Sequence, residues 1–362
     1  MSTLSVERAK THRMASRGRE GGGSQPSIRV AAIGGGSGLS TLLRGLRQYV
    51  ASPNHDEEEC AEGLCLISEL AAVVTVTDNG GSSGRLRRDF NMLPPGDLRN
   101  CMVALSEDEH LISRLFRHRF KGGEGLEGHS FGNLFVAALQ EMTGDFAQAI
   151  KLASQVLAAR GHIYPVTDAN VSLAARMDDG SIVEGETEIT ASHKRIVELM
   201  LDPAEAQPLP ETLEAIERAD LITVGPGSLF TSVITNLLVQ GIPEALASSK
   251  AVRVYICNLM TQANESINLS ASQHIERIYE HTRQPVFDYA LINTAPVSQA
   301  VLQRYAVEHA APIEADIDRI EALGVRCMTG NFAAEGDVLR HATAPVAQAV
   351  LRLGLLGRPR IE

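Results

Sequence analysis

The sequence contains no tryptophan, and its aromatic residues amount to only 4%. A chain of 362 residues with 44% hydrophobic content must therefore build its core from aliphatic side chains and alanine. Such a composition suits alternating strands and helices. No apolar run approaches the roughly 18 to 20 residues that a membrane-spanning helix needs, so membrane insertion is not expected.

Cysteine is scarce and shows no C-x-x-C spacing. The odd count of five, without an apolar leader, predicts reduced thiols and a cytoplasmic location. Residues 1–26 are rich in Arg, Gly and Ser and are expected to form a disordered tail, the alternative being a short arm that binds nucleic acid or a partner. The five cysteines are Cys60, Cys65, Cys101, Cys257 and Cys327.

The chain also lacks a long basic stripe, and its net charge is −11. A nucleic-acid groove is therefore not expected. An anionic ligand would have to be met by a small local group of donors.

Short apolar runs alternate with segments of helical length. Strands are predicted at 28–33, 70–77, 220–224, 252–257 and 289–294, with helices at 40–50, through most of 97–160 and at 343–356. The polar stretch 52–63 reads as a loop, and Asp179-Gly180 indicates a hairpin in an insertion at about 162–195. We predict a single α/β domain at 27–358 with a mostly parallel, doubly wound sheet plus this small β-hairpin.

The stretch "IGGGSGLS" joins the first strand to a helix expected to begin near Ser40. Consecutive glycines let backbone N–H groups converge beside a helix N-terminus, which favours phosphate, although the same glycines could form only a tight turn. There is no G-K-[ST], and Leu39 stands where the G-x-G-x-x-G fingerprint has its third glycine. The candidate phosphate ligands are Gly34, Gly35, Gly36, Ser37, Gly38 and Leu39.

The second strand is followed by "TDNGGSSGRLRRDF". Asp78 could bind a ribose or a metal, or could cap a turn, and Arg85 belongs to a local basic cluster. The G-x-S-x-G match does not place a serine directly at a strand-to-helix corner, so a hydrolase elbow is disfavoured. Asp97 is either an N-cap or a residue beside the ligand, with Asn100 in the same turn. The remaining candidates from this stretch are Thr77, Asn79, Ser82 and Ser83.

Other strand ends and helix entrances repeat the same polar, glycine-rich pattern. Ligands of open α/β sheets bind across the carboxyl ends of the strands, so these loops are expected to face one site. A lone histidine without an E-x-x-H partner does not indicate zinc and could be a packing residue. These candidates are His129, Asn133, Gly225, Gly227, Ser228, Asn258 and Thr261.

Six motifs in order, "GGGSGLSTLLRGL", "TDNGGSSGRLRRDF", "LPPGDLRNCMVAL", "LEGHSFGNL", "ADLITVGPGSLFTSVI" and "VYICNLMTQANES", resemble the YvcK-type gluconeogenesis factors. These are relatives of the CofD 2-phospho-L-lactate transferases. The resemblance covers residues 28–350 and implies a Rossmann-like three-layer fold that binds a nucleotide sugar such as UDP-N-acetylglucosamine or UDP-glucose. It also implies a role in growth on gluconeogenic carbon and in cell shape, through peptidoglycan precursor supply.

Transferred onto this sequence, the resemblance implies that the diphosphate lies on Gly34 to Gly38 and that Arg340 is a further ligand. The family's Asp-Asp pair is Asp78-Asn79 here, which weakens an Mg²⁺ site centred on Asp78. No other cofactor is expected.

Two functions remain open. In the first, a nucleotide sugar shifts a conformation or partner surface, and the protein catalyses nothing. In the second, a CofD-like enzyme moves a phospholactyl group from a GDP-activated donor to a deazaflavin, with Mg²⁺ on the diphosphate. A protein partner in cell-wall precursor metabolism and a homodimer are also expected.

Overall fold

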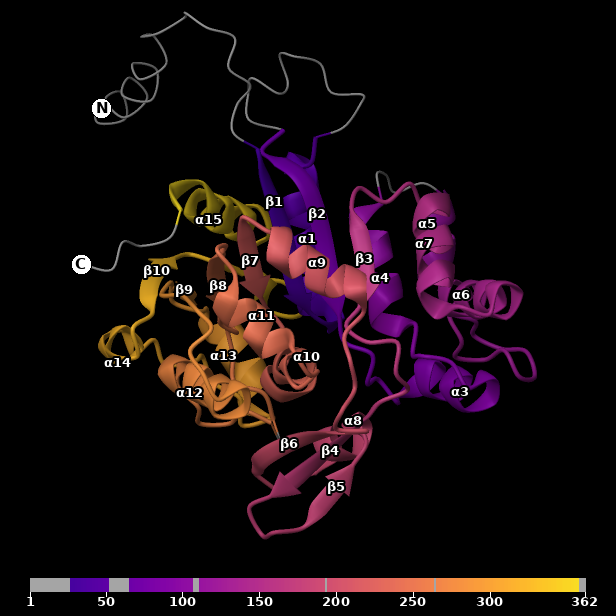
Figure 1. Cartoon of the computed structure of the whole chain (residues 1–362). Helices are drawn as coiled ribbons and strands as arrows, with labels where there is room; N and C mark the ends of the chain where they lie inside the picture. Colours follow the sequence, from indigo (N-terminus) through magenta and orange to yellow (C-terminus); the bar gives the residue numbers. More distant parts are fainter. Residues whose placement is uncertain (1–26, 52–64, 107–110, 193, 264, 358–362) are drawn as a thin grey trace, which may run out of the picture.

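A parallel sheet forms the centre of the molecule (Figure 1). The computed structural model describes residues 27–51, 65–106, 111–192, 194–263 and 265–357. Within these residues the sheet has seven strands, in the order β10 (Arg326–Gly330), β9 (Tyr289–Asn293), β8 (Val252–Ile256), β7 (Leu221–Val224), β1 (Ile28–Gly34), β2 (Ile67–Val74) and β3 (His162–Pro165). The doubly wound α/β fold predicted from the sequence is confirmed.

The strand order reverses between β1 and β7. The chain first runs outward from β1 through β2 to β3, and then returns to β7 on the other side of β1 and runs outward through β8, β9 and β10. Every residue of β7 is buried, as expected for a strand covered on both faces. This reversal creates a switch point at the carboxyl ends of β1 and β7.

Helices cover both faces of the sheet (Figure 1). Mutual contacts join the helices of one face, α1 (Gly36–Leu46), α4 (Gly96–Leu105) and α15 (Thr343–Leu356). The other face carries α9 (Pro210–Arg218), α10 (Thr235–Leu237), α11 (Ile242–Ser248), α12 (Ala271–Thr282) and α14 (Ile317–Ala322). Beside β3 lie α3 (Gly81–Phe90), α5 (Leu111–Arg117), α6 (Phe131–Thr143) and α7 (Phe146–Val156), while α13 (Gln299–Ala306) follows β9.

A small antiparallel sheet projects from the main body (Figure 1). It contains β4 (Ser172–Met177), β5 (Ile182–Glu184) and β6 (Ile196–Asp202), and α8 (Glu186–Ala191) connects β5 to β6. The hairpin around Asp179-Gly180 is present, but the predicted bounds of 162–195 need correction. The segment from His162 joins the main sheet as β3, and β6 adds a third strand that ends at Asp202.

Three other expectations need correction. The first helix begins at Gly36 and not near Ser40, because the glycines themselves enter the helical turn. The short strands β3 and β10 were not predicted, since neither is a run of β-branched residues. The expectation of reduced thiols is wrong for Cys65, which is disulfide-bonded. The absence of a C-x-x-C spacing therefore does not exclude a disulfide, whereas Cys101, Cys257 and Cys327 are free. The expected tail at 1–26 and loop at 52–63 lie outside the described residues.

Two similar Arg–Asp pairs join neighbouring strands. Arg29 donates through Nε and Nη2 to Asp220 at 3.0 Å each, and Arg253 donates to Asp288 at 2.9 and 2.7 Å. In both pairs the aspartate directly precedes the next strand and also accepts the arginine's backbone N–H. The side chains of the first pair are 40% exposed, but those of Arg253 and Asp288 are only 11% and 13% exposed.

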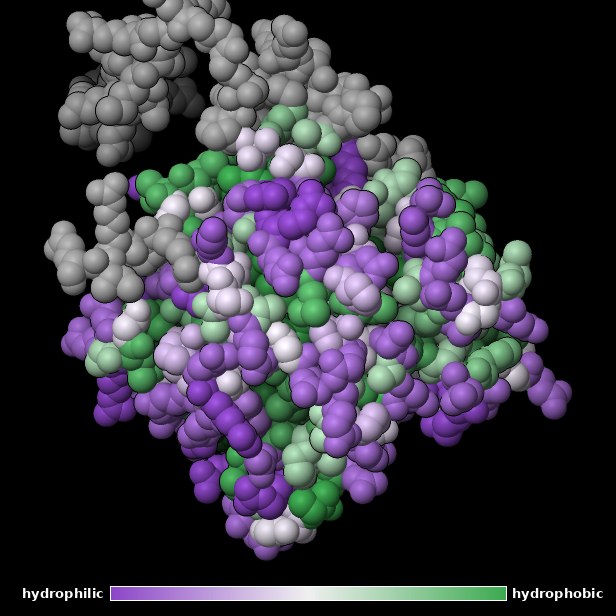
Figure 2. All heavy atoms as spheres, viewed as in Figure 1, coloured by the Kyte–Doolittle hydropathy of each residue, from purple (hydrophilic) through white to green (hydrophobic). Residues whose placement is uncertain are grey.

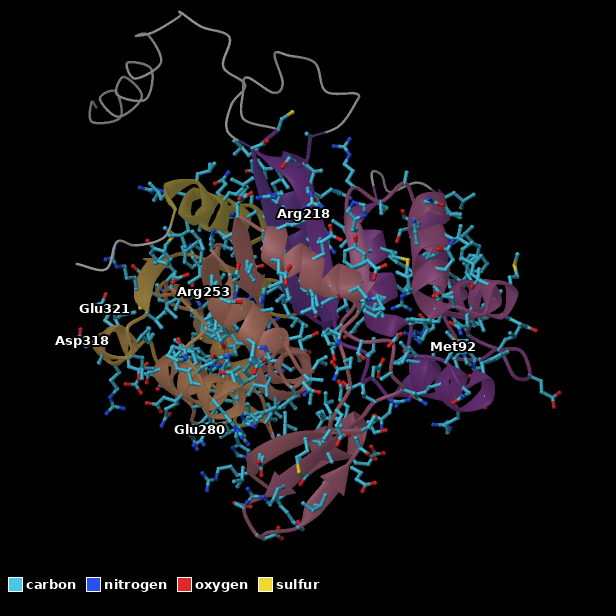
Figure 3. All side chains as sticks on the ribbon, viewed as in Figure 1. Met92, Arg218, Arg253, Glu280, Asp318 and Glu321 are labelled. Atoms are coloured by element: carbon cyan, nitrogen blue, oxygen red, sulfur yellow. The ribbon has the colours of Figure 1, made fainter. Side chains whose placement is uncertain are left out.

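Figure 3 shows Arg253 within the half of the molecule that contains β7 and β8, whereas Asp318 and Glu321 extend outward from α14. The face seen in Figure 2 is a mosaic in which hydrophilic residues predominate. No single helix among the described residues has the length and apolar composition of a membrane span. The segments Leu229–Leu237 and Ile242–Ser248 pass that test only as a pair bent by 77°.

The two pairs offer a matched stability test. Asp288→Asn leaves a buried guanidinium uncompensated, so we expect it to lower the free energy of unfolding by about 3 kcal/mol. The same change at the exposed pair, Asp220→Asn, should cost about 1 kcal/mol or less. Urea unfolding of both variants measures the difference, and equal losses would contradict the role assigned to burial.

Candidate functional site

A cavity of about 280 Å³ lies at the switch point between β1 and β7. It is bounded by the turn after β1, the turn after β7, the loop after β8 and the strand β12 (Arg340–His341), which pairs with β11 (Ala333–Ala334). We call it the first cavity. Its lining includes Gly35, Gly36, Ser37, Gly38, Thr41, Pro226, Gly227, Ser228, Ser232, Asn258, Leu259, Met260, Thr261, Gln262, Tyr305, Val338, Leu339, Arg340 and His341.

Glycine is required at two positions of the β1 turn. Gly36 has φ +62°, a conformation that L side chains rarely adopt. A Cβ at Gly38 would lie 2.3 Å from the carbonyl oxygen of Pro226, so only glycine lets α1 approach the β7 turn this closely. The N-terminus of α1 therefore opens directly onto the first cavity.

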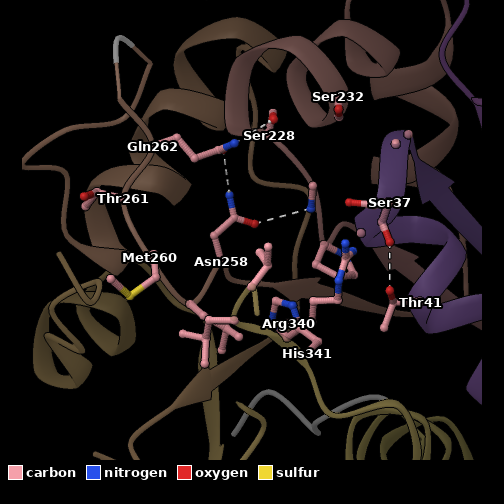
Figure 4. A pocket seen from close by; sticks show the side chains of 18 of the residues that line it. Ser37, Thr41, Ser228, Ser232, Asn258, Met260, Thr261, Gln262, Arg340 and His341 are labelled. Carbon is pink, nitrogen blue, oxygen red and sulfur yellow. Dashed lines mark hydrogen bonds between the residues drawn. The ribbon is translucent and has the colours of Figure 1, made fainter. Parts of the chain in front are cut away.

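Hydrogen bonds of side-chain amides stabilise the wall of the first cavity that faces α1 (Figure 4). Asn258 Oδ1 accepts the Gly227 N–H at 3.3 Å, and Asn258 Nδ2 donates to Gln262 Oε1 at 3.4 Å. Gln262 in turn donates to the Ser228 hydroxyl at 2.9 Å. This chain fixes the β7 turn against the loop after β8.

Arg340 and His341 bring the C-terminal part of the chain to the same cavity (Figure 4). Burial lowers the pKa of His341 to about 4, so the imidazole is neutral near pH 7. Its Nε2 therefore donates to the Cys257 carbonyl, at 3.0 Å, and ties β12 to the end of β8. The exposed Arg340 guanidinium has no carboxylate ion-pair partner among the described residues, and so is available to an anion.

A second cavity of about 260 Å³ lies where α3 and α4 begin. Ser82 in the first turn of α3 lies 3.0 Å from His129 Nδ1 and accepts a hydrogen bond from Asn133 Nδ2 at 3.1 Å. Ser130 caps α6 by accepting the Asn133 N–H. The lining is Asp78, Gly80, Gly81, Ser82, Ser83, Gly96, Asp97, Arg99, Asn100, Arg119 and Asn133.

Asp97 lies between the two cavities. Its Oδ2 accepts the Gly36 N–H at 2.7 Å, while its side chain lines the second cavity. The alternative of an N-cap is wrong, because α4 begins at Gly96 with Pro95 as its cap and Asp97 is already in the first turn. Burial, with a further contribution from Asp78, raises the pKa of Asp97 to about 6.

The small sheet contributes one carboxylate to this region. Glu186, the first residue of α8, accepts a hydrogen bond from Thr77 Oγ1 at 3.3 Å. Burial, followed by the nearby carboxylates Asp97 and Asp78, raises the pKa of Glu186 to about 8. At neutral pH Glu186 is therefore mainly protonated.

Asn79 attaches α8 to the loop after β2. Its Nδ2 donates to Glu188 at 2.8 Å, and its Oδ1 accepts from the Thr187 N–H and hydroxyl at 2.9 and 2.8 Å. The side chain is thus committed to α8 and lines neither cavity. The described residues form no group of three or more His, Cys, Asp or Glu able to hold a metal. Asp78 does not fit a metal centre built from protein ligands alone.

The predicted residues fall into three sets. The first cavity receives Gly35, Gly36, Ser37, Gly38, Gly227, Ser228, Asn258, Thr261 and Arg340. The second receives Asp78, Ser82, Ser83, Asn100 and Asn133. The residues that line neither are Gly34, Leu39, Thr77, Asn79, Arg85, His129 and Gly225.

Physical reasons exclude the third set from the cavity walls. Leu39 is fully buried in the core, and the side chain of Arg85 donates to the Glu127 carbonyl at 2.8 Å. His129 does not line the cavity, and its Nδ1 lies within hydrogen-bond distance of the Ser82 hydroxyl. A Cβ at Gly225 would lie 2.9 Å from the Ile256 carbonyl oxygen, which makes that glycine a packing residue.

The cavity residues that were not predicted as ligands come mostly from distant segments. Tyr305, Val338 and His341 reach the first cavity from beyond β9, and Arg119 and Glu186 approach the second region from the segment after α5 and from α8. No motif marks these positions. Asp97 and Asn100 were predicted from the helix entrance of α4, and Arg99 of the same turn also lines the second cavity.

The fold and the paired cavities define a doubly wound α/β protein with a cavity at its switch point. The family model of the 2-phospho-L-lactate transferase CofD matches residues 30–333, and the chain belongs to this family. It is 45% identical to the gluconeogenesis factor of Halalkalibacterium halodurans, over 91% of this chain and 97% of that one. Identity to the Bacillus subtilis gluconeogenesis factor is 41%, over 91% and 99%.

A crystal structure of a UPF0052 family member from Bacillus halodurans superposes with a TM-score of 0.84. It is 44% identical in sequence and covers 90% of this chain and 99% of that one. These findings confirm the resemblance to the YvcK-type gluconeogenesis factors and the Rossmann-like fold.

The carboxyl of Glu186 should make stability depend on pH. Its folded pKa of about 8 exceeds the ordinary glutamate pKa of 4.5, so between these values the folded state holds a proton that the unfolded state has lost. Stability should therefore fall as pH rises through this window. Glu186→Gln removes the effect, and from about pH 5 to pH 8 its stability should rise by about 3.5 kcal/mol relative to wild type.

Thermal and urea unfolding at both pH values measure this change. Glu184→Gln, the same substitution at an exposed position of β5, is the control and should parallel the wild type. A Glu186→Gln profile parallel to that of the wild type would contradict the assignment.

Asn79→Asp should loosen α8. The substitution removes the donor to Glu188 and places a carboxylate against it, at a cost of about 1 kcal/mol. Hydrogen exchange of amides 186–191 should accelerate about fivefold for a local opening of that size. Asn331→Asp, at an exposed position far along the chain, is the control, and unchanged exchange in Asn79→Asp would refute the docking role.

Proposed function

We propose that this protein binds a UDP-sugar, such as UDP-N-acetylglucosamine or UDP-glucose, with the diphosphate in the first cavity. The carrying observation is that the N-terminus of α1, with its glycines, and Arg340 face the same cavity at the switch point. A helix N-terminus and an arginine are the donors that favour a diphosphate. Asn258 and Thr261 line the cavity as polar groups for the rest of the nucleotide.

In this proposal the protein is a regulatory factor, and nucleotide-sugar binding shifts its conformation or a partner surface. The gluconeogenesis factor names of its relatives support a role on gluconeogenic carbon sources. We propose that the output is peptidoglycan precursor supply and cell shape, through a protein partner in cell-wall precursor metabolism. Binding by a cytoplasmic homodimer is part of the same proposal.

A second candidate is phospholactyl transfer from a GDP-activated donor to a deazaflavin, which the CofD family match favours. Family members that hold Mg²⁺ on paired carboxylates would place it here on Asp78 and position 79. Asn79 is committed to α8, so this chain offers a weaker cation site. The UDP-sugar proposal therefore assigns no reaction to the chain.

A ligand panel tests the proposal. UDP-N-acetylglucosamine, UDP-glucose, GDP and NAD are compared by thermal shift and calorimetry. A ligand at 100 times its Kd adds about 2.7 kcal/mol of stability, so UDP-sugars should raise Tm by several degrees. Preferential stabilisation by GDP, with turnover of a deazaflavin acceptor, would overturn the choice in favour of the transferase.

The Arg340→Gln variant tests whether the UDP-sugar binds in the first cavity. Loss of a charge-assisted contact to the diphosphate should weaken UDP-sugar binding about tenfold. Arg319→Gln, at an exposed position of α14, removes the same charge far from the cavity lining and should bind as the wild type does. Equal affinities of the two variants would remove Arg340 from the site.

A further inference from the structure

We propose that the second cavity recognises an anionic group, a carboxylate or phosphate, held beside the diphosphate of the bound nucleotide. This inference rests on the proposed function and adds the chemical class of the ligand's distal part or of a co-ligand. The observations that carry it are two arginines, a buried amide with one end unpartnered among the described residues, and the position of the cavity beside Asp97.

A buried guanidinium lies in the cavity wall. Arg99 is 9% exposed, and its Nη1 and Nη2 donate to neutral partners, Ser130 Oγ at 2.6 Å and Asn100 Oδ1 at 2.7 Å. No carboxylate lies within ion-pair distance of it among the described residues. Burial, and after it the neighbouring positive charge of Arg119, lower the pKa of Arg99, while the carboxylates Asp97 and Asp78 act in the opposite direction. An anion between the two guanidiniums would relieve both effects.

A polar atom in the same wall has no partner. The Asn133 side chain is 1% exposed, and only one end of its amide is bonded, to Ser82. Because the two ends of an amide can be exchanged by a flip, the free end can serve as a donor while Ser82 donates to the other end. A buried amide left unpaired is costly, so this position fits a ligand oxygen.

The first turns of α3 and α4 also face the cavity, through Gly81, Ser82 and Gly96. Two carboxylates line it as well. Asp78 accepts the Gly80 N–H of the same cavity at 2.9 Å, and Asp97 accepts the N–H of Gly36, which lines the first cavity, at 2.7 Å, so each carboxylate is bonded to a backbone amide. The basic residues Arg99 and Arg119 come from α4 and from the segment after α5, and they line the same cavity.

The volume of the first cavity indicates how a nucleotide sugar would occupy both cavities. A cavity of about 280 Å³ is at the lower end of the roughly 300–1,000 Å³ that ligand pockets occupy. Gly35 and Gly36 line the first cavity and lie against Asp97, which lines the second. A sugar attached to the diphosphate would thus extend past Asp97 toward the arginines.

The test compares UDP-glucose with UDP-glucuronate, which differ only in a hydroxymethyl or carboxylate group at C6 of the sugar. Calorimetry on the full chain should give a Kd about tenfold lower for UDP-glucuronate. Arg119→Gln should reduce this ratio toward one. Arg119 is exposed, so its replacement leaves the fold intact, whereas Arg99→Gln is the more severe variant. Arg117→Gln, an exposed residue of α5 outside both cavity linings, should keep the wild-type ratio.

Inorganic phosphate titrated into the UDP-glucose complex distinguishes the source of the anion. A rise in Tm that Arg119→Gln abolishes supports a separate anionic co-ligand, and the glucuronate preference supports a group on the sugar itself. If UDP-glucose binds but neither effect occurs, the second cavity is not an anion site. If neither UDP-sugar binds, the proposed function fails, and the phosphate titration of the free protein still tests the cavity.

Discussion

The close approach of two strand-end turns is the constraint on which the site depends. The N-terminus of α1 lies so near the β7 turn that a single methylene at Gly38 would collide with the Pro226 carbonyl. The strands β1 and β7 are adjacent and parallel, and the connections that follow them run toward opposite edges of the sheet. The contact between their turns borders the cavity on one side. The glycines therefore serve packing and ligand access together, and the position of α1 depends on both.

Asp97 gives the site its second property. A carboxylate normally stabilises a helix N-terminus, and here Asp97 from α4 bonds to the first amide of α1. The same amide lies where a phosphate would be held, so a bound diphosphate would meet a buried carboxylate whose pKa is already raised to about 6. Phosphate binding should favour protonation of Asp97 or its withdrawal toward the second cavity. The electrostatics of the two cavities are coupled through this one side chain.

The sequence predicted the parts of the site that depend on local chain direction. Glycine-rich turns at the ends of β1 and β7 and the polar loop after β8 all reached the first cavity, because the carboxyl ends of parallel strands meet at one edge. Arg340 was reached through the family resemblance alone. His341, Tyr305, Arg119 and Glu186 could not be found, since their places depend on how remote segments pack.

The prediction also treated as one site what the structure divides into two. Spacing along the chain placed Asp78, Ser82 and Asn133 at strand ends or helix entrances, but it contained no information about the side chain that separates them from the β1 turn. For Asp97 a cap and a position beside the ligand both remained open, because its long-range bond to Gly36 crosses 61 residues. Local patterns identify donors, whereas their grouping requires the tertiary structure.

Asn79 shows how one atom can separate two functions on the same fold. Asn and Asp have the same shape, and either could accept the Thr187 N–H, but only the amide can donate to Glu188. An aspartate would place charge beside Asp78 and would favour a cation there, at the expense of the contact with α8. The asparagine instead holds α8, and with it Glu186, against the loop after β2. In this chain, position 79 therefore carries no charge for a cation and instead links the small sheet to the loop that borders the second cavity.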